Sequence, residues 1–308
     1  MCIRDRLDLM KEKFIITSLS STGTGKTTLM VHLAYLLAQS GLSTALIELD
    51  NRSSFHDCCG LPKPTAEFST ASILTDDFDG NYPFFPLWSD TLNNKAVVCQ
   101  AERNSLESVS RQLTGDPFGM FRLRECLDRF SLTHDVILID APGQQGQLSL
   151  MALCAATHLI ICAEMTQKCI SDINALFEWL YKYKTYLKST PEILGILPSR
   201  YDHNAAIQRN TLNQFPSFSQ KFNTLCFSPI RQSSRFFNAY AMGLPIFLDS
   251  PGSTPCYDFT DNGHVFKTMN KSKRKRLDEK MLQQLPAIAP YIINTIKNSG
   301  EKHGQTTN

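Results

Sequence analysis

Short apolar segments recur along the chain, and helix-like segments separate them. Residues 14–20 (FIITSLS), 42–50 (LSTALIELD) and 134–143 (HDVILIDAPG) each contain a run of aliphatic and β-branched residues. Residues 157–164 (THLIICAE) and 191–200 (PEILGILPSR) repeat the pattern. Continuous apolar strands that alternate with helices are typical of a parallel sheet whose two faces are both covered. The pattern therefore predicts an α/β fold with a mostly parallel, twisted sheet and helices on both faces.

The first of these strands leads directly into a helix. Residues 26–41 (KTTLMVHLAYLLAQSG) place apolar side chains at helical spacing, and Gly41 is a typical stop signal. A second helical segment occupies residues 170–187. Residues 148–163 are the most apolar run, but they are short, contain His158 and indicate a helix followed by a strand rather than a membrane span. Because ligands of parallel sheets bind at the carboxyl ends of strands, we expect the functional site where the first strand ends.

Residues 20–28 (SSTGTGKTT) form the loop at that point and end like a phosphate-binding loop. The pattern G-x-x-x-x-G-K-[ST] is complete at Gly25, Lys26 and Thr27, whereas Ser20 stands where its first glycine is usual. In such a loop the backbone N–H groups at the helix N-terminus point at phosphates, the lysine reaches the β- and γ-phosphates, and the threonine hydroxyl binds Mg²⁺. The predicted nucleotide-binding residues of the loop are Gly23, Thr24, Gly25, Lys26, Thr27 and Thr28.

Acidic residues follow two of the predicted strands. Asp140 ends the run VILI and precedes Ala-Pro-Gly, where P-loop proteins carry an acid that binds the Mg²⁺ shell. Asp50 and Glu48 occupy alternate positions at the end of the second strand, where one carboxylate could orient or deprotonate an attacking water. For Glu48 a structural role is an equal alternative. We predict Lys26, Asp50 and Asp140 as catalytic residues, and Thr27, Asp50 and Asp140 as Mg²⁺ ligands.

Composition limits the partners and the cellular compartment that we expect for this fold. The chain has 308 residues, 42% of them apolar, and a net charge of +2 that does not by itself indicate a nucleic-acid partner. The ten cysteines show no repeated C-x-x-C spacing, which favours buried thiols in a reducing cytosol over disulfides or a zinc site. Residues 51–103 are less regular, and we expect them to form an ordered surface insertion with aromatic side chains packed beneath it.

The two ends of the chain differ from its middle. The opening MCIRDR resembles what one reading frame of a common sequencing adaptor would encode, so we expect residues 1–9 to be a non-native leader and Met10 the natural start. Residues 10–266 are expected to form the nucleotide-binding domain. Residues 267–308 are expected to form a basic C-terminal helical segment with a flexible tail.

Positive charge is concentrated in this C-terminal segment. Seven Lys and Arg residues fall between Lys267 and Lys280 and are opposed only by Asp278 and Glu279. Such a cluster can bind DNA phosphates without reading sequence, although a solvated basic linker would have the same composition. Three further arginines, Arg200, Arg209 and Arg231, would widen the basic surface if they shared its face. The predicted DNA-binding residues are Lys271, Lys273, Arg274, Lys275 and Arg276.

Several stretches, taken together and in this order, resemble the ParA-type partition ATPases, whose superfamily also contains MinD. The resemblance runs from Phe14 to Phe266. It is carried by residues 23–55 (GTGKTTLMVHLAYLLAQSGLSTALIELDNRSSF), 134–164 (HDVILIDAPGQQGQLSLMALCAATHLIICAE), 193–202 (ILGILPSRYD) and 228–247 (SPIRQSSRFFNAYAMGLPIF). The resemblance implies a P-loop NTPase fold that binds ATP and Mg²⁺ and hydrolyses ATP.

Carried over position by position, the resemblance also implies individual roles. Lys26 and Thr27 become phosphate and Mg²⁺ residues, Asp50 the catalytic acid of the second strand and Asp140 the Walker B acid. Two prolines fall where the family lines its adenine pocket, namely Pro198 and Pro229.

The family also implies partners. Its members form ATP-dependent homodimers, bind DNA non-specifically and are released when a centromere-binding, ParB-like partner stimulates hydrolysis. The resemblance thus implies a cytoplasmic, nucleoid-associated protein that segregates a plasmid or chromosome.

The chain departs from the family pattern at the phosphate loop. The family's signature lysine, which reaches the phosphates of the partner subunit, is replaced by Ser21, and the next glycine by Thr22. A serine hydroxyl supplies a hydrogen bond but no charge, so we expect slow hydrolysis. Glu48 replaces a more usual Asp, and Asn51-Arg52 stand where Pro-Gln is common.

Three alternatives follow from these features. A MinD-like membrane-positioning ATPase would use residues 277–296 as an amphipathic anchor, but Pro286 and Pro290 interrupt the helix that this requires. Loss of the signature lysine would also suit a nucleotide-bound scaffold with little hydrolysis. A ligase of the dethiobiotin synthetase kind shares the fold, but no segment of the sequence marks a metabolite pocket.

Overall fold

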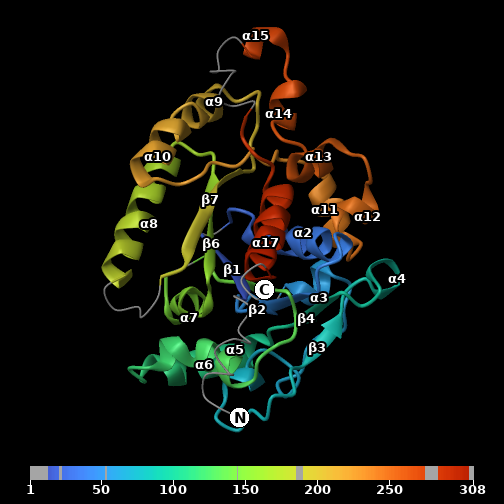
Figure 1. The fold of residues 1–308 in the computed structure, drawn as a ribbon, viewed down its shortest axis with the longest axis vertical. Helices are drawn as coiled ribbons and strands as arrows, with labels where there is room; N and C mark the ends of the chain where they lie inside the picture. Colours follow the sequence, from blue (N-terminus) through green and yellow to red (C-terminus); the bar gives the residue numbers. More distant parts are fainter. Residues whose placement is uncertain are drawn as a thin grey trace.

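A mostly parallel sheet is the centre of the computed structural model, which describes residues 13–20, 23–52, 54–143, 145–184, 190–274 and 284–304. Within these residues seven strands form one sheet in the order β3-β4-β2-β5-β1-β6-β7 (Figure 1). All neighbouring strands are parallel except β3 and β4. The strands are β1 Phe14–Leu19, β2 Thr44–Glu48, β3 Phe84–Pro86, β4 Ala96–Cys99, β5 Val136–Asp140, β6 His158–Glu164 and β7 Glu192–Ser199.

Helices lie on both faces of this sheet. They are α2 Lys26–Gln39, α3 Phe55–Cys58, α4 Ser89–Leu92, α5 Arg103–Thr114, α6 Arg122–Arg129, α7 Gln147–Ala155, α8 Cys169–Lys184, α9 Ala206–Leu212, α10 Phe215–Phe222, α11 Arg235–Ala241, α12 Ile246–Asp249, α13 Thr254–Thr260, α14 His264–Lys267, α15 Lys271–Arg274 and α17 Ile288–Gly304. Two 3₁₀ turns complete the set, η1 Ser72–Leu74 and η2 Gly119–Phe121.

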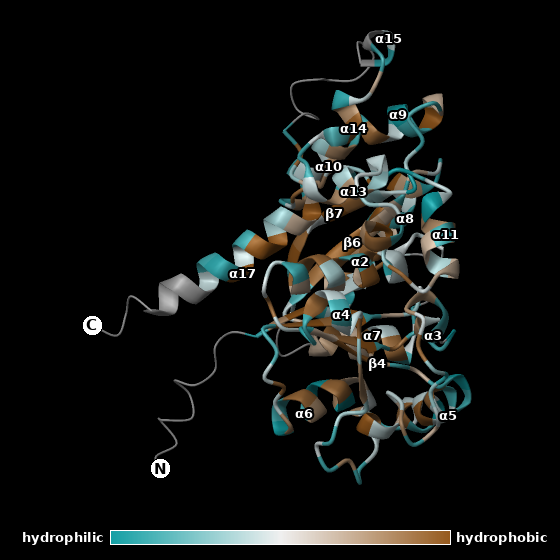
Figure 2. Cartoon of the chain, turned by 90° about the vertical axis from the view of Figure 1, so that its right-hand side faces the viewer, coloured by the Kyte–Doolittle hydropathy of each residue, from teal (hydrophilic) through white to brown (hydrophobic). Residues whose placement is uncertain are grey.

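Alternate residues of each strand reach opposite faces and so create two apolar layers. In β1, Phe14 and Ile16 pack with α2 and α17, whereas Ile15 packs with α5, α6 and α7. The outer part of the second layer is built from β6 and α8, where Leu159 and Ile173 belong to one buried cluster. Figure 2 shows the apolar strands inside and polar residues on the outer sides of the helices. The predicted α/β fold, with a parallel sheet covered on both faces, is confirmed.

The five strands that the apolar runs predict are confirmed as β1, β2, β5, β6 and β7. Residues 51–103, which we expected to form a surface insertion, instead contribute two strands to the sheet. β4 pairs in parallel with β2 and is largely buried, and β3 adds an antiparallel edge. The apolar run of β4 is only AVVC, four residues long, which is too short to stand out in the sequence. The aromatics of this region do pack together, since Tyr82 stacks on Phe84.

The C-terminal helix α17 is part of the core rather than an appendage. Ile288 and Ile292 are buried in the same cluster as Leu33 and Leu37 of α2. Figure 2 shows α17 starting beside β7 and extending outward from the sheet. In the part of the chain that the structure describes, every helix falls short of the length or the apolar character that a membrane crossing needs. The nine cysteines there are free and buried, as the sequence predicts.

A buried ion pair ties the segment after β7 to the C-terminal helices. The Arg231 guanidinium donates to both carboxylate oxygens of Asp258, at 2.7 and 2.9 Å, and to the Thr268 hydroxyl at 2.7 Å. The two charged side chains are 11% and 0% exposed. Burial raises the pKa of Asp258, and the guanidinium opposes that rise. Arg231 therefore holds the fold together and does not widen a basic surface.

We expect Arg231→Met to lower the free energy of unfolding by about 3–5 kcal/mol, because the Asp258 carboxylate would remain buried without its partner. Urea unfolding of the full chain measures this change. The double variant Arg231→Met/Asp258→Leu should recover most of the loss, because it removes both charges. A single variant as stable as the unmodified chain would contradict this role.

Candidate nucleotide-binding site

The loop between β1 and α2 is shaped by two glycines. Gly23 and Gly25 have φ values of 83° and 86°, in the left-handed region that favours glycine. Gly25 is the N-cap residue of α2. The first backbone N–H groups of α2 have no carbonyl partner within the helix, so this end of the helix can bind an anion.

Lys26 begins α2 and lies almost completely buried, with 3% of its surface exposed. Its Nζ donates to the Ser20 hydroxyl at 3.1 Å, and the Ser20 and Thr24 hydroxyls also form a hydrogen bond. Burial lowers the pKa of Lys26, while nearby acids, Asp140 among them, oppose that shift. Ser20, which the loop pattern marks only as a missing glycine, therefore closes the loop through its side chain. Ser21 and Thr22 lie outside the described residues.

Thr27 and Asp140, each predicted as an Mg²⁺ ligand, are in direct contact. The Thr27 hydroxyl donates to Asp140 Oδ2 at 2.7 Å, and the fully buried Oδ1 of the same carboxylate accepts no hydrogen bond. Burial raises the pKa of Asp140 to about 7, although the Thr27 hydrogen bond opposes this shift. A buried carboxylate oxygen without a donor, beside a threonine hydroxyl, is the set of oxygen ligands that suits Mg²⁺. Among the described residues, no group of three or more His, Cys, Asp or Glu could hold a metal ion, so Mg²⁺ would need ligands from phosphate and water as well.

Asp50 lies at the same edge of the sheet, but an arginine covers its carboxylate. Arg52 Nε lies 3.1 and 2.9 Å from the two Asp50 oxygens, and its Nη2 lies 2.5 Å from Oδ2. The backbone N–H of Arg52 also donates to Asp50 Oδ1 at 3.0 Å. In the sequence, Arg52 stands out only as a departure from the family pattern, and no residue pattern signals this pairing.

Of the two alternative roles for Glu48, its contacts support the structural one. Its Oε1 accepts the N–H groups of Ser54 and Phe55 at 2.7 and 3.1 Å, and its Oε2 accepts that of Ala101 at 2.8 Å. Burial raises its pKa to about 8, against the effect of these three hydrogen bonds. The carboxylate thus joins the start of α3 to the end of β4, which leaves Asp50 and Asp140 as the acids beside the loop.

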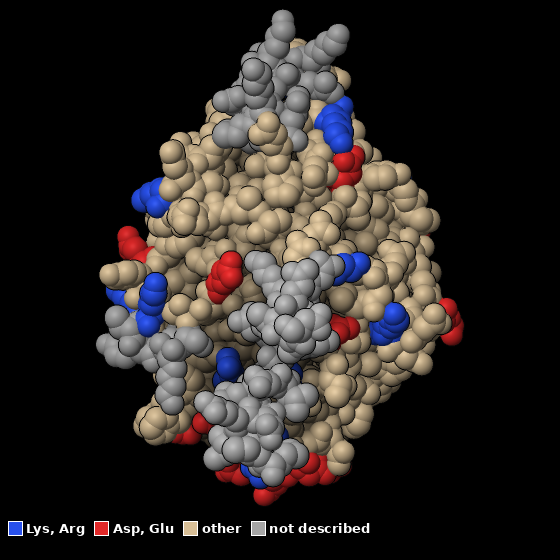
Figure 3. All heavy atoms as spheres, in the orientation of Figure 1, with Lys and Arg blue, Asp and Glu red and all other residues tan. Residues whose placement is uncertain are grey.

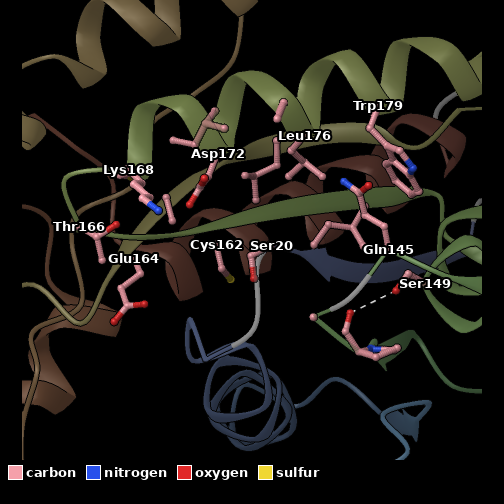
Figure 4. Close-up of a pocket in the computed structure, with 18 of the residues that line it drawn as sticks. Ser20, Gln145, Ser149, Cys162, Glu164, Thr166, Lys168, Asp172, Leu176 and Trp179 are labelled. Atoms are coloured by element: carbon pink, nitrogen blue, oxygen red, sulfur yellow. Dashed lines mark hydrogen bonds between the residues drawn. The ribbon is translucent and has the colours of Figure 1, made fainter.

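Two cavities adjoin the loop on different sides. The first, about 240 Å³, is lined by Gly23 to Thr28, by Arg52, and by Phe236 and Tyr240 of α11. The second, about 750 Å³, is lined by Ser20, by residues of β6 and α8 and by the loop that follows β5. Figure 4 shows Ser20 at the floor of this second cavity, with α8 above it. The predicted phosphate-binding residues Gly23, Thr24, Gly25, Lys26, Thr27 and Thr28 all line the first cavity.

The end of β7 holds the loop from its other side. The Ser199 hydroxyl donates to the Thr24 carbonyl at 2.7 Å, and Arg200 donates to the Gly23 carbonyl at 2.9 Å. Pro198 and Pro229 are buried beside each other, since the Pro198 carbonyl accepts the N–H of the residue after Pro229 at 2.9 Å. Neither proline is among the described residues that line the two cavities, so their adenine-binding role stays a prediction.

The basic segment is only partly described. Lys271, Lys273 and Arg274 belong to α15, where the Lys273 ammonium donates to the Asn204 side chain. Lys275 and Arg276 lie outside the described residues. Arg209 is buried and donates to two backbone carbonyls, so it does not extend a basic surface. On the face that Figure 3 shows, the described Lys and Arg side chains are scattered, and some of them lie beside Asp or Glu.

The fold and the loop together define a class of protein. A glycine-bearing loop between a parallel strand and a helix, with a buried Asp at the end of the neighbouring strand, is a P-loop nucleotide-binding domain. Residues 12–193, more than half of the chain, match the model of a family described as an AAA domain, so the chain belongs to that family. Together with its relatives, this match places the chain among the ParA-type P-loop ATPases.

Individual relatives are distant but match over most of their length. The chain is 25% identical over 245 residues to the cell division protein PomZ of Myxococcus xanthus, which covers 77% of this chain and 72% of PomZ. It is 24% identical over 249 residues to the sporulation initiation inhibitor protein Soj of Bacillus subtilis, which covers 78% of this chain and 92% of Soj. The structure of a Cyanothece McdA(D38A)–ATP complex shares the fold, with a TM-score of 0.66, 18% identity and coverage of 93% and 96% of the two chains.

His32 lies on α2, lines the first cavity and connects α2 to the C-terminal helices, although no motif in the sequence marks it. Its Nδ1 lies 2.6 Å from the Thr28 carbonyl, and its Nε2 accepts the Ile246 N–H at 3.0 Å. These two contacts require a neutral ring that carries its proton on Nδ1. Complete burial lowers the pKa of His32 to about 4.

We therefore expect His32 to favour the folded state above pH 6.5 and to lose this contribution as the pH falls towards 4. The unfolded chain takes up a proton near pH 6.5, whereas the folded chain resists protonation, so the loss between pH 8 and 5 should be about 2 kcal/mol. Urea unfolding of the unmodified chain and of His32→Gln is measured at both pH values. The His32 contribution is the difference between the two proteins in how far their free energy of unfolding falls from pH 8 to pH 5. Other titrating groups are common to both proteins, so a difference that does not change with pH would contradict the assignment.

Proposed function

We propose that the chain is a partition ATPase that binds ATP with Mg²⁺, hydrolyses it slowly, and binds DNA non-specifically as a nucleotide-dependent homodimer. One observation carries the proposal: the phosphate loop, the Thr27–Asp140 pair and Asp50 converge at one edge of the sheet. Soj, PomZ and ParA among its relatives support the partition class.

In this proposal each residue has a chemical task. The loop N–H groups and Lys26 hold the phosphates, and their positive charge stabilises the charge that develops when the terminal phosphoryl group is transferred. Thr27 and Asp140 would hold Mg²⁺, which shields the phosphate oxygens when bound. Asp50 orients the attacking water through a hydrogen bond to its carboxylate.

The proposed partners follow from the same family. A second copy of the chain would face the nucleotide, the segment from Lys271 to Arg276 would bind DNA phosphates, and a ParB-like protein would stimulate hydrolysis. Nucleoid association in the cytoplasm follows from DNA binding. The predicted low hydrolysis rate rests on Ser21, whose side chain carries no charge.

The MinD-like alternative is less well supported by α17. The apolar residues that an amphipathic anchor would insert into a bilayer include Ile288 and Ile292, and both are buried against α2. To bind a membrane with them, the chain would have to expose part of its own core, which costs free energy in proportion to the apolar area released.

Nucleotide binding can be tested with Lys26→Ala. Loss of a charged hydrogen-bond donor costs about 1.5–3 kcal/mol, so the dissociation constant for ATP should rise roughly 10- to 100-fold. Titration with a fluorescent ATP analogue measures it. Lys221→Ala is the matched control, because this lysine pairs with Asn174 in an exposed position away from the loop. Equal affinity in Lys26→Ala and the unmodified chain would argue against the site.

DNA binding can be tested by filter binding with ATP, ADP or no nucleotide. We expect tight binding only with ATP, and a variant with alanine at Lys271, Lys273, Arg274, Lys275 and Arg276 should lower the slope of log affinity against log salt concentration by roughly 3–5. Lys182→Ala/Lys184→Ala, on α8, provides a control for loss of charge elsewhere. Equal DNA affinity in all three nucleotide states would exclude the switch.

A further inference from the structure

Arg52 contacts the proposed catalytic acid, Asp50, and also lines the cavity beside the phosphate loop. Its guanidinium makes three contacts of 2.5 to 3.1 Å with the Asp50 carboxylate, which is 3% exposed. This side-on arrangement uses both acceptor oxygens of the carboxylate. A water molecule that approached Asp50 would therefore compete with a charged donor for the same oxygens.

The same guanidinium also reaches the cavity beside the loop. The Arg52 side chain is 53% exposed and lines this cavity together with Gly23, Gly25 and Lys26. Of the described residues that line it, Lys26 and Arg52 are the two with cationic side chains. His32, which also lines it, is held neutral by its two hydrogen bonds. A triphosphate in this cavity would thus meet two cations, one buried and one half-exposed.

Arg52 has two anionic partners of similar geometry within its reach. The planar fork of a guanidinium suits a phosphate as well as a carboxylate, and it binds either with two parallel hydrogen bonds. A partly buried ion pair gains little net free energy, because desolvation and solvent screening offset its attraction, so exchange for a more highly charged partner is accessible. Asp50 would keep the 3.0 Å hydrogen bond from the Arg52 backbone N–H during the exchange.

We propose that Arg52 senses the terminal phosphate of ATP by leaving Asp50 for it. Before nucleotide binds, Arg52 neutralises Asp50 and blocks its carboxylate. When ATP occupies the cavity, the guanidinium binds the γ-phosphate, and Asp50 becomes free to accept a hydrogen bond from the attacking water. No covalent bond changes in this exchange. The inference rests on the proposed ATPase function and adds a cation from the same subunit to a loop that carries Ser21 in place of the family's lysine.

ADP lacks the phosphate that Arg52 would bind, so the test compares two nucleotides. Dissociation constants for ADP and for the non-hydrolysable analogue AMPPNP are measured with Mg²⁺ for the unmodified chain, Arg52→Gln and Arg52→Lys. We expect Arg52→Gln to weaken AMPPNP binding at least about tenfold and to change ADP binding by less than about threefold. Arg52→Lys should restore part of the AMPPNP affinity, because it keeps the charge without the fork.

Two further variants separate this role from a structural one. Arg52→Gln leaves Asp50 buried without its ion-pair partner, so the double variant Asp50→Asn/Arg52→Gln, which carries no charge at either position, serves as a second measurement of the affinity ratio. It should show the same loss of preference for AMPPNP over ADP. Arg124→Gln, which removes an arginine paired with Asp128 on α6, should leave the preference unchanged.

The outcomes distinguish the inference from the proposed function. If the unmodified chain prefers AMPPNP and both Arg52→Gln variants retain the same preference, the sensing role is wrong while the ATPase function stands. If the unmodified chain binds neither nucleotide, the proposed function fails and the inference with it. A selective loss of AMPPNP affinity, with a matching fall of at least about tenfold in kcat for ATP in Arg52→Gln, would establish the role.

Discussion

Parallel pairing of β2 and β5 is the constraint on which the candidate site depends. Their register places Glu48 opposite Asp140, and the Leu49 N–H continues the pairing to the Asp140 carbonyl at 2.9 Å. Three carboxylates, including that of Asp50, are thereby brought to one buried edge, where charge without a partner is costly. Glu48 meets three backbone N–H groups and Asp50 meets Arg52, whereas Asp140 keeps one oxygen without a donor. The free oxygen of Asp140 is therefore the position at this edge where a cation would be bound.

The sequence predicted the elements of this edge better than their contacts. Apolar runs, a glycine-bearing loop and an acid after a strand are local features, so the five strands and the position of the loop and Asp140 at one edge of the sheet could be predicted. The role of Glu48 could not, because one of its partners, the Ala101 N–H, is 53 residues away and follows the short strand β4. The Asp50–Arg52 pair is local, yet nothing in the residue types distinguishes an arginine that covers a carboxylate from one that faces water.

The positions of charged residues in the sequence also did not predict which of them lie on a basic surface. Arg209 and Arg231 add to the positive count of the C-terminal half, but Arg209 is buried against backbone carbonyls, and the Arg231 side chain is 11% exposed and paired with an Asp 27 residues away. Arg200 lies at the phosphate loop and donates to the Gly23 carbonyl. Side-chain burial depends on pairings between distant segments, so a count of positive residues in the sequence does not locate a basic surface.

The phosphate loop and the catalytic acid differ in how ready they are for nucleotide. The Gly23 and Thr24 carbonyls are held by Arg200 and Ser199, and Ser20 ties Lys26 to the start of the loop, so its shape is set by contacts behind the cavity. Groups positioned in advance bind without paying for reorganisation. Asp50, in contrast, must first lose Arg52 from its carboxylate. On the proposed function, binding and hydrolysis therefore make separate demands on this chain: the loop can hold phosphates as it stands, whereas hydrolysis also requires Arg52 to move from Asp50 to the terminal phosphate.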